Sequence, residues 1–201
     1  MSSLRSTIAI AVCAAVALVS CSTDGRTMQE PTPNQIAAIS PGTTIPPEGD
    51  AVIEQTAPLT LTAPWASGTA LDPRYSCDGE AFSPSLAWSS APPETKAFGI
   101  ALTDRDRPDY VHWVITNIDP TVTTILENTN PAGAFVAENS EKKRGYAAPC
   151  PPAGSTHSYG ITLYALSALV DTQKYSTAPS IIEQMNAVVL EVGTNDFTYS
   201  R

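Results

Sequence analysis

The sequence predicts a mainly β domain with one helix near its C-terminal end. Eighteen prolines in 201 residues disfavour a helical bundle, because proline interrupts helix interiors. From residue 58 onward, short runs alternate apolar and polar residues or are rich in β-branched and aromatic residues, which is typical of strands. Clusters of Pro, Gly, Ser and Asp between these runs are typical of turns.

Residues 1–20 are predicted to be a lipoprotein signal peptide. Arg5 supplies one early positive charge, and an apolar run follows over residues 8–19. This run is too short for a membrane-spanning helix, which needs about 20 residues. The small residues before Cys21 resemble a bacterial lipobox, in which the cysteine is acylated with fatty acids such as palmitate. An uncleaved anchor or simple secretion is the alternative.

Residues 21–57 are predicted to be a flexible tether. They are rich in Pro, Thr, Ser, Gly, Gln and Ala, and they lack the apolar stripe that a folded element buries. A flexible chain of this length spans on the order of 30 Å. We therefore expect a lipid-anchored protein at the extracytoplasmic face of the cell membrane, with residues 58–201 as its folded domain.

Four runs within the domain are expected to be strands. Residues 59–63 alternate, whereas residues 97–102 are small and apolar. Residues 111–118 mix β-branched and aromatic residues, and residues 159–166 also favour extended structure.

The expected helix begins near Ser180, which has the spacing of a capping box with Glu183. Gly193 is positioned to end it. Its apolar residues recur at helical spacing: Ile181, Ile182, Met185, Val188, Val189 and Val192.

The four cysteines predict one disulfide. Cys13 lies in the signal peptide and Cys21 is the lipid carrier, which leaves Cys77 and Cys150 in an oxidising compartment. Two free buried thiols are the alternative.

Charge and motifs exclude several functions. The net charge of −9 comes from 20 acidic and 11 basic residues without a long basic run, so we expect no nucleic-acid partner. Ser155 and Ser158 flank His157, but neither has a context that implies an oxyanion hole. The sequence also has no nucleophile elbow, no zinc-protease motif and no phosphate-cradling glycine loop, so we expect no enzymatic activity and no cofactor.

The stretch from residue 103 to residue 113 carries the candidate chemistry. If the strand before it continues, the period of two places Asp104 and Asp106 on one face. His112 opens the next strand, and His157 is the only other histidine. Zinc could be held by two histidines and two aspartates, but no paired histidine spacing supports it, so we expect no metal.

The chain resembles the phosphatidylethanolamine-binding protein family in its bacterial and archaeal form. Four blocks in the family's order carry the resemblance: residues 75–88, residues 104–108, His112-Trp113, and residues 146–159. The resemblance implies an antiparallel β-sandwich with a C-terminal helix, few short helices and a small anion pocket at one end. It also implies the pocket residues: Asp104, Asp106, His112, His157 and Tyr159, with Pro151 at the mouth.

Two departures from the family pattern affect this corner. Where the family has Asp-Pro-Asp-Ala-Pro, this chain has Arg105 in place of the proline and Arg107 in place of the alanine. Where the family usually has an arginine between the histidine and the tyrosine, this chain has Ser158. Loss of the proline should make the corner less rigid. If the family's arginine packs or pairs outside the pocket, Ser158 costs an ion pair and little binding. If that arginine instead tunes ligand affinity, its replacement by Ser158 puts binding in doubt.

We expect the two aspartates to hold both imidazoles and raise their pKa, so that histidinium donates to an anion such as phosphate or phosphoethanolamine. Binding should then strengthen below about pH 6.5. In the alternative, both histidines are satisfied core residues and Asp104 caps a turn. A second function is also open: family relatives are associated with inhibition of kinases or proteases, and an exported member would meet a hydrolase.

Overall fold

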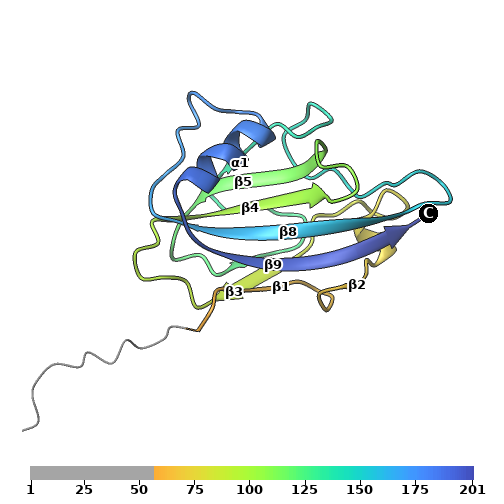
Figure 1. Ribbon diagram of the computed structural model, residues 1–201, viewed down its shortest axis with the longest axis horizontal. Coiled ribbons are helices and arrows are strands. Elements are labelled where there is room, and N and C mark those ends of the chain that lie inside the picture. Colours follow the sequence, from red (N-terminus) through yellow and green to blue (C-terminus); the bar gives the residue numbers. More distant parts are fainter. Residues whose placement is uncertain (1–56) are drawn as a thin grey trace, which may run out of the picture. The chain divides into compact units, whose positions relative to one another are not determined.

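Two β-sheets and one α-helix form residues 57–201, the part of the chain that the computed structural model describes (Figure 1). In chain order the elements are β1 (Thr60–Thr62), β2 (Thr69–Ala70), the 3-10 helix η2 (Pro73–Tyr75), β3 (Leu86–Ser89), β4 (Ala97–Asp104), β5 (Val111–Ile118), β6 (Thr124–Ile125), β7 (Phe135–Val136), β8 (Thr156–Leu166), α1 (Ala178–Ala187) and β9 (Val189–Ser200). The larger sheet has the strand order β2-β9-β8-β4-β5-β7, and the smaller has β1-β3-β6. Neighbouring strands are antiparallel except β2 and β9, which are parallel.

The main core lies between the two sheets. Trp88 of the smaller sheet packs edge-on against Phe98 of the larger one, with ring centroids 5.3 Å apart. Trp113 of β5 is fully buried in the same core. The predicted mainly β sandwich is therefore confirmed, and both tryptophans are core residues.

The second core lies between the other face of the larger sheet and α1, which Figure 1 shows next to β5. Ile181 and Met185 of α1 are fully buried there. Gly99 of β4 permits this close approach, because a Cβ at this position would overlap Met185 Sδ. Nearly every residue of β4 is buried because both of its faces are covered, which explains why residues 97–102 are apolar without alternation.

The helix differs from the sequence prediction at both ends. It begins at Ala178, so Ser180 lies in its first turn, where its hydroxyl donates to the Thr177 carbonyl at 2.9 Å. Its predicted C-terminal part is strand β9, which includes Val189, Val192 and Gly193. Pairing with β8 along almost the whole strand outweighs the helical spacing, because valine suits a strand and the ladder satisfies the backbone.

The predicted disulfide joins Cys77 to Cys150, with their Cα atoms 5.4 Å apart. It connects the segment after η2 to the loop before β8. Because 73 residues separate the two cysteines, the bridge stabilises the fold by about 4 kcal/mol in the chain-entropy model.

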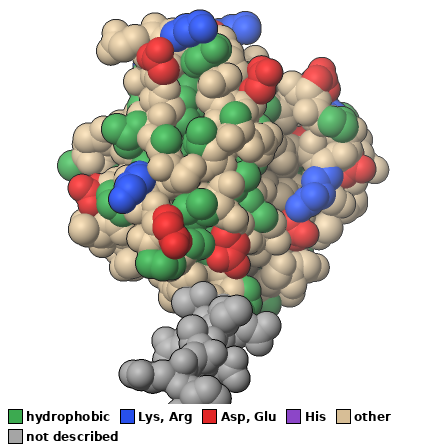
Figure 2. Space-filling model, turned by 60° about the vertical axis from the view of Figure 1, so that its left-hand side comes forward, with side chains coloured by type: hydrophobic (Ala, Val, Ile, Leu, Met, Phe, Trp, Pro, Cys, Tyr) green, Lys and Arg blue, Asp and Glu red, His purple; other side chains and the backbone are tan. Residues whose placement is uncertain are grey.

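The described surface carries charges of both signs. On the face in Figure 2, acidic and basic side chains lie among polar and apolar ones without a continuous basic patch. None of the helices within residues 57–201 is long and apolar enough to cross a membrane. The predicted signal peptide, the lipid carrier Cys21 and almost all of the tether lie outside the described residues.

Candidate functional site

The first part of the site is the corner between β4 and β5. Asp104, the last residue of β4, is buried, and its Oδ1 accepts hydrogen bonds from the backbone N–H groups of Asp106 at 2.9 Å and Arg107 at 3.1 Å. These bonds close the turn, as aspartate side chains commonly do. Asp104 therefore does cap a turn, but this role uses only one of its two oxygens.

The second oxygen of Asp104 faces His157 on the neighbouring strand. Asp104 is paired with Tyr159 in the β4–β8 register, and His157 lies two residues away on the same face of β8. Its Nδ1 lies 2.7 Å from Asp104 Oδ2. A carboxylate only accepts, so Nδ1 carries the hydrogen, and a protonated His157 forms an ion pair with Asp104.

His112 enters the site from β5 and is buried. Its Nδ1 lies 2.8 Å from the carbonyl oxygen of Ala147, a neutral acceptor. Burial lowers the pKa of His112, and this effect exceeds the opposing effects of the Ala147 carbonyl and the Asp104 carboxylate. The expectation that the aspartates raise the pKa of both histidines is therefore wrong for His112, because burial outweighs the raising effect of the Asp104 carboxylate.

Tyr159 of β8 lies between the two histidines. Its ring packs edge-on against His112, with centroids 5.4 Å apart, and stacks against Phe197 at 5.1 Å. Its pKa is raised, first by burial and then by the charge of Asp104. The hydroxyl therefore stays protonated and can donate a hydrogen bond to a ligand.

These side chains line a cavity of about 40 Å³. The structure brings four of the predicted pocket residues to its wall, namely Asp104, His112, His157 and Tyr159. The resemblance also implies that backbone amides of the loop over residues 148–152 face the pocket, and Ala148 and Cys150 of this loop do line it. Arg107 and Tyr110 are the lining residues that sequence reasoning did not place there.

Two predicted pocket residues lie next to the cavity without lining it. Asp106 is exposed, and its Oδ2 accepts the backbone N–H of Ser158 at 2.6 Å. Pro151 follows the lining residue Cys150, and its carbonyl accepts from Arg201 at 3.5 Å.

Arg107 supplies a permanent positive charge at the cavity. Its guanidinium lies over the Tyr110 ring, 4.6 Å from the centroid, which holds it at the pocket wall. Within residues 57–201 it forms no ion pair, whereas the neighbouring arginine, Arg105, pairs with Asp196. The sequence signal for this role was the departure from alanine at position 107.

Arg105 restrains the corner on the opposite face of the sheet. Its backbone N–H donates to the Ser158 carbonyl at 2.8 Å, a bond that proline could not make. Its guanidinium covers Gly160, where a Cβ would lie 2.5 Å from it. These contacts hold the corner, which has no proline between Asp104 and Asp106. Ser158 alternates with His157 and Tyr159 along β8, so its side chain points away from the pocket.

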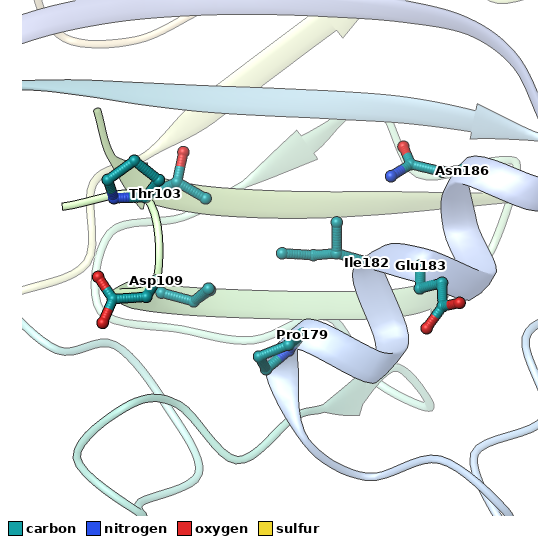
Figure 3. A pocket seen from close by; sticks show the side chains of 8 residues that line it. Thr103, Asp109, Pro179, Ile182, Glu183 and Asn186 are labelled. Carbon is teal, nitrogen blue, oxygen red and sulfur yellow. The ribbon is translucent and has the colours of Figure 1, made fainter. Parts of the chain in front are cut away.

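The domain has two larger hollows, one of which adjoins the pocket. A groove of about 470 Å³ shares Arg107 and Tyr110 with the small cavity, and it continues along Glu138 and Lys142. A hollow of about 380 Å³ lies between α1 and the β4–β5 corner, where Figure 3 shows Ile182 and Pro179 of the helix facing Thr103 and Asp109.

One group of side chains in the described part could offer ligands to a metal. Single ligand atoms of Asp104, Asp106 and His157 lie within 4.8 Å of one another. The two carboxylates, however, accept hydrogen bonds from backbone N–H groups and from the imidazole. In the described structure these three side chains are therefore engaged in hydrogen bonds.

Comparison with known proteins now identifies the family. The model of the family described as phosphatidylethanolamine-binding protein matches residues 62–200. The chain belongs to the phosphatidylethanolamine-binding protein family. Two solved structures of the family type share its fold: E. coli YbcL has a TM-score of 0.68 and 26% identity, covering 72% of this chain and 99% of YbcL. The homologue CT736 from Chlamydia trachomatis has a TM-score of 0.66 and 27% identity, covering 72% of this chain and 98% of CT736.

Sequence relatives agree with this assignment. A UPF0098 protein of Methanothermobacter thermautotrophicus is 39% identical over 124 residues, covering 58% of this chain and 82% of that protein. Lipoprotein LppC of Mycobacterium tuberculosis is 39% identical over 113 residues, which are 54% of this chain and 56% of LppC. The match with LppC thus spans little more than half of that protein.

Proposed function

We propose that this chain is an extracytoplasmic, lipid-anchored binding protein whose pocket takes a small phosphorylated head group or a similar anion. The observation that carries the proposal is the convergence of three potential donors on one cavity: the guanidinium of Arg107, the hydroxyl of Tyr159 and the imidazole of His157. Each can donate a hydrogen bond to an anionic oxygen, and two of them can carry a positive charge.

The carboxylates at this site do not oppose an anion as strongly as their charge suggests. Asp104 directs one oxygen at two backbone N–H groups and the other at His157. Asp106 directs an oxygen at the N–H of Ser158. These donors compensate the negative charge locally, and protonated His157 neutralises Asp104 outright.

The cavity size favours a small charged group. A volume of about 40 Å³ accommodates a few water-sized groups, as in a tetrahedral oxyanion, and is too small for an alkyl chain. The rest of a larger ligand would lie in the adjoining groove, whose wall also includes Arg107. We propose binding without catalysis: the Ser155 hydroxyl donates to the Pro152 carbonyl at 2.7 Å, and Ser158 faces away from the pocket.

Calorimetry with phosphoethanolamine tests this function. Wild type should bind, because Arg107, Tyr159 and His157 offer hydrogen-bond donors at one cavity. His157→Ala should bind much more weakly, whereas the adjacent Ser158→Ala should match wild type. No binding heat in wild type would contradict the proposal.

The membrane anchor is a separate part of the proposal. It is supported by the lipobox at Cys21 and by the name of the relative LppC, a lipoprotein. Cys21→Ala should abolish incorporation of labelled palmitate and release the protein from the membrane fraction. A variant that stays wholly in that fraction would show that another segment anchors the chain.

A protein partner is the second candidate function. The groove of about 470 Å³ beside the pocket is long enough to continue a contact that begins at Arg107 and Tyr110. Pull-down of an envelope hydrolase by wild type, lost in Lys142→Glu, would support this function. The absence of phosphoethanolamine binding in both wild type and His157→Ala would favour it further.

A further inference from the structure

The inner wall of the pocket holds two buried polar atoms that no other group within residues 57–201 hydrogen-bonds. They are Nε2 of His112 and the hydroxyl oxygen of Tyr159. The two residues are 3% and 1% exposed, and both line the cavity. A buried polar atom without a partner costs stability, so a ligand that supplies the partners gains affinity.

These two atoms have opposite hydrogen-bonding roles. The Ala147 carbonyl can only accept, so His112 Nδ1 carries the hydrogen, and Nε2 of the neutral ring is an acceptor. Burial lowers the pKa of His112 and raises the pKa of Tyr159, which keeps the ring neutral and the hydroxyl protonated. The wall therefore presents one acceptor beside one donor.

The groups around His112 do not reverse this assignment. Asp104 and Glu141 favour the protonated ring, and Arg107 disfavours it, but all three act less strongly than burial. The rings of Tyr110 and Tyr159 pack against the imidazole at 4.7 and 5.4 Å, and neither carries a charge near neutral pH. His157, across the cavity, has its own carboxylate partner.

We propose that the pocket selects an oxyanion that still carries a proton, such as a singly charged phosphate monoester, over an unprotonated oxyanion of the same shape, such as a sulfate ester. The P–OH group donates to His112 Nε2, while the other oxygens accept from Tyr159 and Arg107. A sulfate ester has no hydrogen to donate, so one of its oxygens faces the lone pair of Nε2. This inference rests on the proposed function and adds the protonation state of the ligand.

Methyl phosphate and methyl sulfate form a matched pair of probes, because the singly charged forms differ only in one hydrogen and the central atom. At about pH 6, close to the second pKa of a phosphate monoester, much of the methyl phosphate is singly charged. Calorimetry on wild-type protein should give at least about tenfold tighter binding of methyl phosphate than of methyl sulfate. The preference should shrink as the pH rises toward 8 and the phosphate dianion replaces the monoanion.

A variant locates the preference at His112. His112→Gln places a rotatable amide at the Nε2 position, which can donate or accept, so methyl sulfate should gain affinity and the ratio should approach one. Ser158→Ala, on the outer face, should keep the wild-type ratio.

The wild-type comparison decides the inference even if His112→Gln does not fold. Equal affinities of wild type for the two probes would overturn the inference and leave the proposed function standing. Failure of wild type to bind either probe would overturn both.

Discussion

The two imidazoles of the pocket differ in the oxygen that holds them. On β5, His112 donates from Nδ1 to the neutral carbonyl of Ala147 and is almost fully buried. On β8, His157 directs its Nδ1 at the carboxylate of Asp104 and keeps 13% of its side chain exposed. Burial together with a neutral partner keeps the first ring uncharged, whereas the second ring faces a carboxylate. The pocket therefore has a neutral inner wall and an outer wall that can carry charge.

This difference shows that residue type alone does not define an anion site. A histidine pair in a sequence suggests two cations, but burial keeps the ring of His112 uncharged near neutral pH. The permanent cation in this pocket is Arg107, which stands where the family pattern has alanine. The charged groups of the pocket thus lie in the corner and next to it on β8. The buried, uncharged hydrogen-bonding group lies on β5.

The largest expected effect comes from releasing the loop that holds the inner wall. The disulfide at Cys150 fixes the loop that also carries the Ala147 carbonyl. Replacing Cys77 and Cys150 together with alanine should lower the free energy of unfolding by about 4 kcal/mol, measured by urea denaturation. A loss below about 1 kcal/mol would show that the loop is held by other contacts.

The next largest effect should come from the outer wall. Asp104→Asn keeps an oxygen for the two backbone N–H groups of the corner, but its amide then faces the Nδ1 hydrogen of His157. We expect a loss of about 2 kcal/mol in the free energy of unfolding, together with weaker phosphoethanolamine binding. The exposed neighbour Asp109→Asn is the control, and equal losses in the two variants would contradict the account.

Variants of the two arginines of the corner test whether a positive charge must lie at the pocket wall to affect binding. Arg107→Ala should weaken phosphoethanolamine binding about tenfold, since a charged donor at the wall is lost. Arg105→Ala should leave affinity unchanged and cost at most about 1 kcal/mol of stability, because its pair with Asp196 is exposed. Calorimetry at low and high salt distinguishes them, and an equal fall in affinity for both would indicate a general charge effect.

The smallest effect is a pH dependence from the inner wall. Because burial lowers the pKa of His112, the unfolded chain binds a proton there more readily than the folded one. The free energy of unfolding should therefore fall as the pH drops below about 6.5, by at most about 1.4 kcal/mol per pH unit from this residue. His112→Phe should reduce that slope. If denaturation curves from pH 7.5 to pH 5 give the same slope for His112→Phe and wild type, the pH dependence of stability comes from other groups.

Local sequence patterns predicted the parts of the fold that a short window determines. Residues 111–118 are β5 with the predicted bounds, because buried β-branched and aromatic residues favour a strand whatever its neighbours are. The strand β9 was missed because Val189 and Val192 continue the helical spacing of α1. Its conformation depends on pairing with β8, which a local pattern does not reveal.

The candidate site likewise has features that the sequence predicted and features that only the structure shows. The family resemblance indicated four residues that line the cavity, but no pattern could show that one imidazole meets a carbonyl and the other a carboxylate. The contact between Asp104 and His157 joins residues 53 positions apart, and only the strand register brings them together. Arg107 could have been suspected from its departure from the family pattern, yet its position over Tyr110 required the structure.

Nitrogen-detected NMR of the two histidines tests the contrast between the walls most directly. At pH 7, His112 should show a protonated Nδ1 and an unprotonated Nε2, and phosphoethanolamine should shift the signals of both His112 and His157. A doubly protonated His112 at pH 7, or histidine signals that do not respond to phosphoethanolamine, would contradict the account.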